Sequence, residues 1–386
     1  MVRFKRFPSW QPVFAHADLK CDDSRPSLHY ALIVKSLRPL LLDQNPEDWD
    51  LGEGPAYRRQ QVIEWIFAKR ATSVAEMSNL PAALRQQLEA SYDFTALKLA
   101  RLQGSADTTR KLLWELRNGD YIESVLIPAS TDLFGERSDR FTLCVSTQVG
   151  CAYGCKFCAS GLEGWKRNLT PGEIVAQIIE TERVAKTRIN NLVFMGMGEP
   201  LANYKNLMQA LHLINASWGI GIGARHITIS TSGLAPQIRE LADQPLQIRL
   251  ALSLHGATDE VRQQIMPVNR KYPLAELLDA CADYQAKKRK MMTLEYILIE
   301  DVNDSLEQAA LLAKHARRLH AKVNLIPYNT VEGLPWRRPG DAIIDQFADV
   351  VNAGHVTATV RREKGHDIDA ACGQLRLKQL KASASL

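Results

Sequence analysis

The sequence predicts an α/β fold: a partial (βα)6 barrel of the TIM type, preceded by a small N-terminal helical domain and a linking β-hairpin. Three observations support this prediction. Apolar runs of strand length alternate six times with helical stretches within 137–376, apolar side chains recur at helical spacing after residue 56, and a turn signal joins two apolar runs near residue 119. A complete eight-stranded barrel usually needs about 250 residues, so six units in a shorter segment favour a partial barrel.

The composition is that of an ordinary globular protein. Of 386 residues, 46% are apolar and 24% are charged, and 48 Lys and Arg against 43 Asp and Glu give a net charge of +5. This mild positive charge is compatible with a polyanionic partner but does not identify one. No apolar run approaches the roughly 18 residues of a membrane span, and the basic N-terminus lacks the apolar core of a signal peptide, so we expect no membrane partner.

The N-terminal part of the chain divides into a leader and a helical domain. Residues 1–28 show no periodicity, and we expect a loosely ordered leader there. Within 29–95, the run AYRRQQVIEWIFAKR places apolar side chains such as Val62 and Ile66 at helical spacing. A second helix should begin at Pro81, since proline suits the first turn of a helix.

The same helical domain carries four basic side chains, at Arg58, Arg59, Lys69 and Arg70. A solvated helix face is the simpler explanation for such charges. Contact with RNA is the alternative that would give the domain a function of its own.

A β-hairpin is expected to link the helical domain to the barrel, within 96–136. In the run KLLWELRNGDYIESVLIP, two apolar strands flank Asn118-Gly119-Asp120, a strong hairpin turn signal. The polar stretch STDLFGERSDR that follows is predicted to be a loop.

The barrel domain is expected at 137–376, with a tail at 377–386. Its strands are predicted at 141–147, 189–197, 224–231, 246–255, 291–300 and 322–329. The helices between them are predicted at about 171–187, 204–216, 235–242, 273–288 and 305–320. Strands that alternate with helices of this length are typical of βαβ units, so the sheet should be parallel.

The run CAYGCKFC is the most specific signal in the chain. It places Cys151, Cys155 and Cys158 in a loop directly after the first barrel strand, at the face where such barrels carry out their chemistry. Thiolates are soft ligands that suit iron–sulfur clusters and zinc. A structural zinc site needs four ligands, whereas three thiolates on a four-iron cluster leave one iron open. We therefore predict an iron–sulfur cluster, against which Phe157 can pack, with zinc as the alternative.

This odd and clustered set of seven cysteines is a poor framework for disulfides. It favours a reducing, cytoplasmic location.

The cysteine spacing resembles that of the radical S-adenosylmethionine superfamily. This resemblance implies one [4Fe-4S] cluster, whose open iron binds S-adenosylmethionine before one-electron cleavage gives a deoxyadenosyl radical. Gly198 and Glu199 in MGMGEP match the superfamily position that contacts the amino group of the cofactor.

A closer resemblance covers about Ala56 to Leu375 and points to the RlmN family, radical methyltransferases that modify carbon-2 of adenosine in 23S rRNA and tRNA. Its motifs occur here in the family's order, as AYRRQQVIEWIF, IESVLIP, LCVSTQVGC, KRNL, MGMGEP, ITISTSG, ALSLHG, MPVNR, VNLIPYN and DIDAACGQL. The resemblance implies RNA substrates, an N-terminal accessory domain that binds RNA, and a flavodoxin or ferredoxin as electron donor.

The family resemblance assigns catalytic roles to three residues. Cys372 would become S-methylcysteine at the expense of one cofactor molecule, and a second molecule would supply the radical. Cys144 would then form a transient disulfide with Cys372. Glu123 would accept a proton, although an outward strand residue in a salt bridge is the alternative for this position.

Further positions match the family's cofactor contacts, namely Ser230, Ser253, Leu254, His255 and Asn329. They lie at predicted strand ends, where hydroxyl, imidazole and amide groups can hydrogen-bond ribose and carboxylate oxygens.

One of these matches allows a second interpretation, and two cysteines elsewhere have no match. His255 could instead be a core histidine. Cys21 and Cys281 match no family motif, and Cys281 is expected to be a buried apolar residue inside a helix.

Two other functions compete with carbon-2 methylation. A sister activity methylates carbon-8 of the same rRNA adenosine and confers ribosomal antibiotic resistance; it shares the cluster and both outlying cysteines. We favour carbon-2 because GMGEP and STSG look more like the housekeeping branch. A non-catalytic iron–sulfur or zinc protein that binds RNA is the alternative from another class, and it predicts no cofactor cleavage.

Overall fold

The computed structural model describes residues 38–105, 109–129, 140–162, 164–331, 333–361 and 373–384. The predicted leader, most of the polar loop after the hairpin, Cys21 and Cys372 lie outside these ranges. Residues Arg38–Leu386 form one compact unit.

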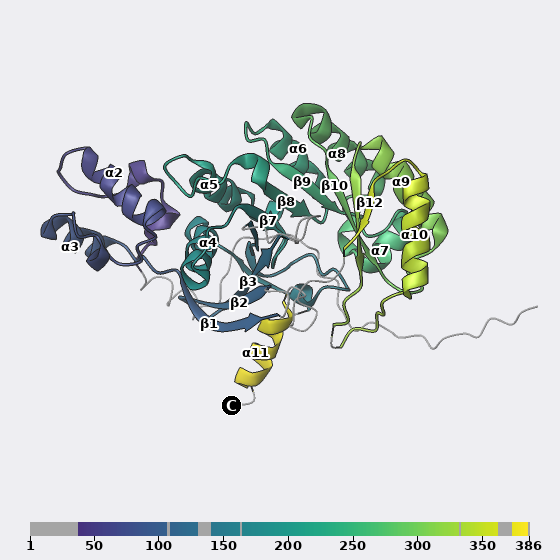
Figure 1. Ribbon diagram of the computed structural model, residues 1–386, viewed down its shortest axis with the longest axis horizontal. Coiled ribbons are helices and arrows are strands. Elements are labelled where there is room, and N and C mark those ends of the chain that lie inside the picture. The colour runs from purple at the N-terminus through teal and green to yellow at the C-terminus, as the bar shows by residue number, and fades with distance from the viewer. Residues whose placement is uncertain are drawn as a thin grey trace, which may run out of the picture. The chain divides into compact units, whose positions relative to one another are not determined.

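A ten-stranded sheet organises this unit, in the order β1-β2-β3-β4-β7-β8-β9-β10-β11-β12 (Figure 1). From β4 onward all neighbouring strands are parallel, and β1 to β4 pair antiparallel. The parallel strands are β4 Phe141–Cys144, β7 Asn191–Phe194, β8 Ile227–Thr231, β9 Arg249–Ser253, β10 Thr293–Leu298, β11 Lys322–Pro327 and β12 Ala358–Val360. The prediction of an α/β partial barrel is confirmed, and β12 adds a short strand that was not predicted.

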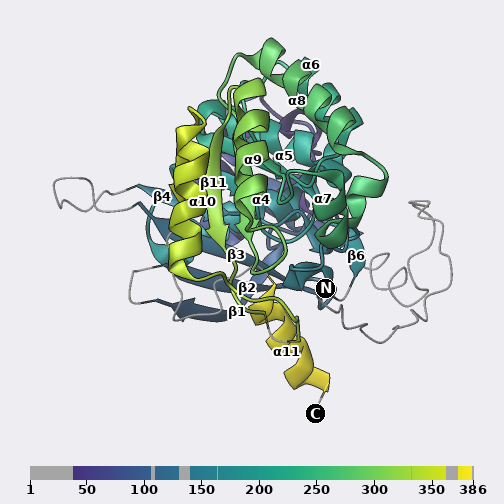
Figure 2. The ribbon, with the colours of Figure 1, turned by 90° about the vertical axis from the view of Figure 1, so that its right-hand side faces the viewer.

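Helices cover the outer face of the curved parallel sheet (Figures 1 and 2). They are α4 Pro171–Ala185, α5 Tyr204–Asn215, α6 Ala235–Asp243, α8 Leu274–Lys288, α9 Leu306–Arg318 and α10 Asp341–Ala353, with a short α7 Asp259–Ile265 before α8. The predicted helices are all present, whereas α7 and α10 were missed. The α4 helix begins at a capping box, in which Thr170 Oγ1 accepts from the Glu173 amide and the Glu173 carboxylate accepts from the Thr170 amide, at 3.2 and 3.0 Å.

The core lies between the sheet and these helices. Strand side chains such as Leu192, Ile229 and Leu294 are fully buried, as expected for parallel strands with apolar runs. Cys281 is fully buried in α8, which confirms the prediction that it is an apolar core residue.

The hairpin prediction is confirmed, and the hairpin proves to be part of the main sheet. β2 Arg110–Leu116 and β3 Tyr121–Pro128 pair across the predicted turn, and β3 continues the sheet by pairing with β4. An outer strand, β1 Leu97–Gly104, was not predicted because most of its side chains are exposed and it contains a register shift.

The N-terminal helices follow the sequence pattern closely. α2 Tyr57–Ile63 continues into one π-helical segment, Glu64–Ala68, and α3 Ala82–Ser91 begins directly after Pro81. Short 3₁₀ helices at Leu41–Asp43, Pro46–Asp48 and Val74–Glu76 complete this part.

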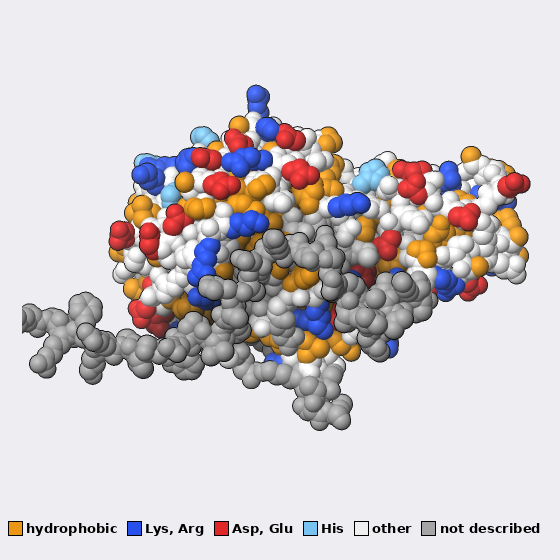
Figure 3. Space-filling view, turned by 180° about the vertical axis from the view of Figure 1, so that it is seen from behind, with side chains coloured by type: hydrophobic (Ala, Val, Ile, Leu, Met, Phe, Trp, Pro, Cys, Tyr) orange, Lys and Arg blue, Asp and Glu red, His pale blue; other side chains and the backbone are white. Residues whose placement is uncertain are grey.

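Arg70 departs from the expectation of a solvated or RNA-facing basic side chain. Its guanidinium is buried and forms an ion pair with Glu182 of α4 at 2.8 Å. This pair links the helical segment to α4 of the barrel. Breaking it would leave a buried charge without a partner, which is energetically costly. On the face shown in Figure 3, exposed basic and acidic side chains are interspersed.

Two smaller elements border the site. A two-stranded sheet of β5 Gln148–Gly150 and β6 Trp165–Asn168 flanks the cysteine loop, which ends in a 3₁₀ helix, Ala159–Gly161. A C-terminal helix, α11 Gln374–Ala384, occupies most of the predicted tail and packs against β3 and that 3₁₀ helix. Among the described residues, no helix is both long and apolar enough to cross a membrane.

Candidate functional site

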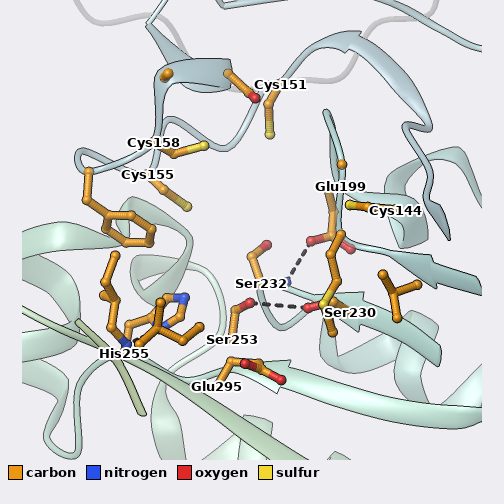
Figure 4. A pocket seen from close by; sticks show the side chains of 18 of the residues that line it. Cys144, Cys151, Cys155, Cys158, Glu199, Ser230, Ser232, Ser253, His255 and Glu295 are labelled. Atoms are coloured by element: carbon orange, nitrogen blue, oxygen red, sulfur yellow. Dashed lines mark hydrogen bonds between the residues drawn. The ribbon is translucent and has the colours of Figure 1, made fainter. Parts of the chain in front are cut away.

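A cavity of about 360 Å³ opens at the carboxyl ends of the parallel strands (Figure 4). Most of the residues selected from the sequence line it: Cys144, Cys151, Cys155, Cys158, Gly198, Glu199, Ser230, Ser253, His255 and Asn329. Glu123 and Leu254 are buried but lie outside the lining, and Cys372 lies outside the described residues. The fold thus brings together groups that are up to 185 positions apart in the sequence, from Cys144 to Asn329 (329 − 144).

The cysteine loop is held by backbone contacts on several sides. The Cys151 amide donates to the Gly164 carbonyl at 3.0 Å, and the Lys156 amide donates to the carbonyl of Ile265, the last residue of α7, at 2.9 Å. The indole of Trp336 donates to the Lys156 carbonyl at 2.9 Å. These bonds fix the backbone of the loop.

The three thiols of this loop point into one part of the cavity (Figure 4). Burial raises the pKa of Cys151 to about 12 and holds the pKa of Cys155 well above its usual value. Such thiols ionise when a metal replaces their protons. The buried hydroxyl of Ser160, which also lines the cavity, has no hydrogen-bond partner among the described residues. The donor set therefore fits a thiolate-bound cluster with a polar ligand beside it.

Gly198 and Glu199 form a rigid corner after β7. Gly198 has a φ of +95°, and a Cβ there would lie 2.5 Å from the Cβ of Gln148, so only glycine fits. The Glu199 carboxylate accepts from the amides of Leu201 at 3.0 Å and Ser232 at 2.6 Å. Burial raises the pKa of Glu199, and these hydrogen bonds partly oppose the effect.

Ser230 and Ser253 face each other at the ends of neighbouring strands, with their hydroxyl oxygens 3.3 Å apart (Figure 4). The pair offers both donors and acceptors to a ligand in the cavity.

His255 lies beyond β9 and contacts the cysteine loop. Its Nδ1 accepts from the Ile297 amide at 3.0 Å, so Nε2 carries the proton of the neutral ring. The ring of Phe157 meets it edge-on, with centroids 5.0 Å apart. Phe157 therefore contacts a candidate cofactor residue as well as bordering the cysteine loop.

Glu123 lies on β3, and hydrogen-bond donors from other segments surround its carboxylate. Its carboxylate accepts from the amides of Gly373 at 2.7 Å and Arg376 at 2.6 Å, and the ammonium of the fully buried Lys111 lies 2.9 Å away. The carboxylate thus caps the N-terminus of α11, where a negative charge is stabilised. Neither the partner Lys111 nor this contact, across 250 positions, had a signal in the sequence.

Gly373 is packed against the cysteine loop. Its φ is +86°, and a Cβ there would lie 2.7 Å from Ser160 Oγ. Cys372 precedes Gly373 in the chain, so the docking of α11 ties this end of the chain to the loop that carries Cys158.

Sequence reasoning missed two charged residues near the cavity. Glu295 on β10 lines it, accepts from the Asn324 amide group at 2.6 Å, and has a pKa raised by burial. Arg262 on α7 is fully buried. Glu295 could not be recognised as a cavity residue because it lies within the apolar run of a predicted strand. Arg262 lies in a short helix that was not predicted.

Comparisons with known proteins agree with this arrangement. Residues 145–313 match the model of the radical SAM superfamily, and residues 49–93 match the ribosomal RNA large subunit methyltransferase N-terminal domain. The fold, the cysteine loop and these matches define a radical S-adenosylmethionine enzyme, which uses a [4Fe-4S] cluster and S-adenosylmethionine.

Close relatives identify the family. The chain is 57% identical over 323 residues to a probable dual-specificity RNA methyltransferase RlmN of Akkermansia muciniphila, covering 84% of this chain and 90% of the relative. It is 46% identical to the dual-specificity RNA methyltransferase RlmN of Anaeromyxobacter dehalogenans, covering 84% and 87%. The chain belongs to the RlmN family of dual-specificity RNA methyltransferases.

A solved structure supports the same assignment. The crystal structure of a radical SAM methyltransferase from Sphaerobacter thermophilus superposes with a TM-score of 0.82 at 40% identity, covering 87% of this chain and 98% of that one. Family membership removes the alternative of a structural zinc or non-catalytic protein.

Proposed function

We propose that this enzyme methylates carbon-2 of an adenosine in 23S rRNA and in tRNA through an S-methylcysteine at Cys372, with two molecules of S-adenosylmethionine per turnover. The observation that carries the proposal is the position of Cys144. Its buried thiol lines the same cavity as Cys151, Cys155 and Cys158. A cysteine that is not part of the cluster motif but shares its cavity is what a thiol-based release step requires.

The cavity residues divide into two groups in this proposal. Cys151, Cys155 and Cys158 hold the cluster. Contacts to S-adenosylmethionine come from Gly198, Glu199, Ser230, Ser253, Leu254, His255 and Asn329. When bound, the cluster and cofactor supply a deoxyadenosyl radical, which takes one hydrogen atom from the S-methyl group.

The two outlying cysteines have different tasks. The thiolate of Cys372 takes a methyl group from the first cofactor molecule by displacement, which leaves S-methylcysteine and S-adenosylhomocysteine. After hydrogen abstraction, the methylene carbon bonds to carbon-2 of the adenine. Glu123 is the proposed acceptor of the carbon-2 proton. The Cys144 thiolate then attacks the sulfur of Cys372, and a transient disulfide joins the two sulfurs. The carbon–sulfur bond breaks with its electron pair on the methylene carbon, which takes up a proton to become the methyl group. The one surplus electron of the radical adduct returns to the electron-transfer chain that supplied it.

The remaining segments of the chain and a separate electron donor have supporting roles in this proposal. We propose that residues 29–95 form an RNA-binding accessory domain, that 96–136 link it to the methyltransferase domain at 137–376, and that a cytoplasmic flavodoxin or ferredoxin delivers the electron. The match of residues 49–93 to a methyltransferase N-terminal domain supports the first of these assignments.

Cysteine variants test the proposal. C372A should abolish methylation, because no thiol remains to carry the methyl group. C144A should instead accumulate a covalent protein–RNA adduct, visible as a shifted band on a denaturing gel, because no thiol remains to release it. The matched control is C281A, which removes a buried cysteine in α8 away from the cavity and should turn over normally. Normal turnover by C144A would overturn the release step.

A further inference from the structure

Arg262 joins two segments that carry candidate cofactor residues to a third segment that follows α7. Its guanidinium is fully buried, with Nε donating to the Leu254 carbonyl at 3.1 Å and Nη1 donating to Asn269 Oδ1 at 2.8 Å. Nη2 donates to the Ser232 carbonyl. Ser232 follows β8, Leu254 follows β9, and Asn269 lies beyond α7, so one side chain fixes the ends of two neighbouring strands. Only an arginine offers donors in this forked geometry.

Two glycines leave space for this side chain. A Cβ on Gly256 would lie 2.6 Å from the Arg262 amide nitrogen, and a Cβ on Gly233, where φ is +111°, would lie 3.1 Å from Nη2. These glycines belong to the segments STSG and SLHG, and Asn269 belongs to MPVNR. Three motifs that the family resemblance highlighted therefore meet at Arg262.

The positive charge of Arg262 lacks an ordinary countercharge. Arg262 takes part in none of the ion pairs found among the described residues. The nearby carboxylate of Asp259 accepts instead from the Asn269 amide group, at 2.8 Å, so a neutral amide stands between the two charges. Because a buried charge is costly without a partner, this arrangement indicates an anion close by.

The cysteines of the loop, bound to a cluster as thiolates, would supply that anion. It rests on the end of α7 through the bond from Lys156 to Ile265. Ser232, whose carbonyl accepts from Arg262, lines the same cavity as Cys151, Cys155 and Cys158, and so does Met266, which follows α7.

We infer that Arg262 is a positioning residue that fixes the cofactor-contacting ends of β8 and β9 and provides the countercharge for the thiolate-bound cluster. The inference rests on the proposed assignment of Cys151, Cys155 and Cys158 as cluster ligands and is independent of which adenine carbon is methylated. A fixed cation stabilises a cluster that gains negative charge on reduction, so Arg262 raises its reduction potential.

Two substitutions separate the charge of Arg262 from its geometry. In R262M, the reconstituted cluster should have a lower reduction potential and the protein a weaker affinity for S-adenosylmethionine. In R262K, the charge is kept, so the potential should stay near that of the wild type. The affinity should still fall at least tenfold, because an ammonium group cannot bond all three segments. The potential is read by redox titration with electron paramagnetic resonance, and the affinity by equilibrium dialysis.

The control is R70M, which removes another buried arginine far from the cysteine loop in sequence and should change neither quantity. Iron and sulfide are quantified first, because a wild-type protein that holds no cluster would contradict the cluster assignment itself. An R262M protein with full cluster content, wild-type potential and wild-type affinity would overturn the inference. If R262M does not fold, wild-type affinity in R262K would overturn it.

Discussion

His255 shows how the fold fixes the state of a single side chain. Its φ of +58° lies in the left-handed region, which non-glycine residues seldom adopt. This conformation directs Nδ1 to the Ile297 amide. Burial, together with the charge of Arg262, lowers the pKa of His255 to about 3. The ring is therefore neutral at physiological pH and serves as a fixed hydrogen-bonding group.

This lowered pKa makes stability depend on pH. Between about pH 3 and pH 6.5 the unfolded chain protonates His255 and the folded chain does not, so stability falls as the pH falls through this window and is unaffected above it. In H255N, an amide oxygen can still accept from Ile297, and asparagine tolerates the left-handed conformation.

The loss of unfolding free energy from pH 7.5 to pH 5 should be about 2 kcal/mol smaller in H255N than in the wild type, by urea denaturation of the apoprotein. Identical pH dependence in the two proteins would show that His255 titrates normally in the folded state.

Gly198 tests the corner that precedes Glu199. G198A would place a methyl group against Gln148, whose side chain also accepts from the Glu199 amide at 2.9 Å. We expect at least a tenfold weaker affinity for S-adenosylmethionine and a lower melting temperature, because the corner must move. G104A is the control, since a Cβ there meets no atom within 4 Å. Unchanged affinity in G198A would argue against this corner as a cofactor contact.

At the residue scale, motifs identified most of the cavity. Cys151, Cys155 and Cys158 were predictable because their spacing is local, and Glu199 because it follows a recognisable strand. Arg262 and Lys111 were not, because their partners lie in other elements and neither belongs to a local pattern. The facing of Cys144 was ambiguous from strand periodicity, and the structure places its thiol in the cavity wall.

Among the elements, α11 is held at its N-terminus by a single carboxylate. Its N-terminal amides donate to Glu123, which is itself paired with Lys111 inside the sheet. Removing one partner of a buried ion pair typically costs about 3–5 kcal/mol, which is enough to release a short terminal helix.

Two variants distinguish docking of α11 from proton transfer by Glu123. K111M and E123Q should both increase hydrogen exchange in the peptide spanning 373–384, and both should slow S-methylation of Cys372, measured by mass spectrometry. If Glu123 acts only as a proton acceptor, E123Q would leave S-methylation intact and K111M would have little effect. K98M, which removes an exposed lysine of β1 paired with Glu115, is the control.

The same scale shows what pattern reasoning can and cannot find. The barrel strands were predictable because buried parallel strands form continuous apolar runs. β1 was missed because its exposed edge has no such run, and α11 because its helix lacks a clear apolar face. The short α7 lies in the connection between β9 and α8, where the sequence pattern predicts a loop.

At the scale of the whole molecule, one sheet joins the parts that the sequence separates. The hairpin strands β2 and β3 extend the sheet of parallel strands by antiparallel pairing. The β3 strand contributes both Val125, which lines the cavity, and Glu123, which holds α11. The cavity lined by the three loop cysteines and the docking site of the C-terminal helix are therefore neighbours on a single framework. The proposed transfer of a methyl group by Cys372 comes from the family resemblance of the run DIDAACGQL.

Isomer analysis of the product is the decisive test of methylation at carbon-2. The enzyme would be expressed in cells that lack their own carbon-2 methyltransferase, and nucleosides from purified 23S rRNA and tRNA would be resolved by mass spectrometry against standards. We predict 2-methyladenosine in both RNAs, and in neither when C372A is expressed. Finding only 8-methyladenosine would rule out methylation at carbon-2, and 2-methyladenosine that persists with C372A would rule out Cys372 as the carrier of the methyl group.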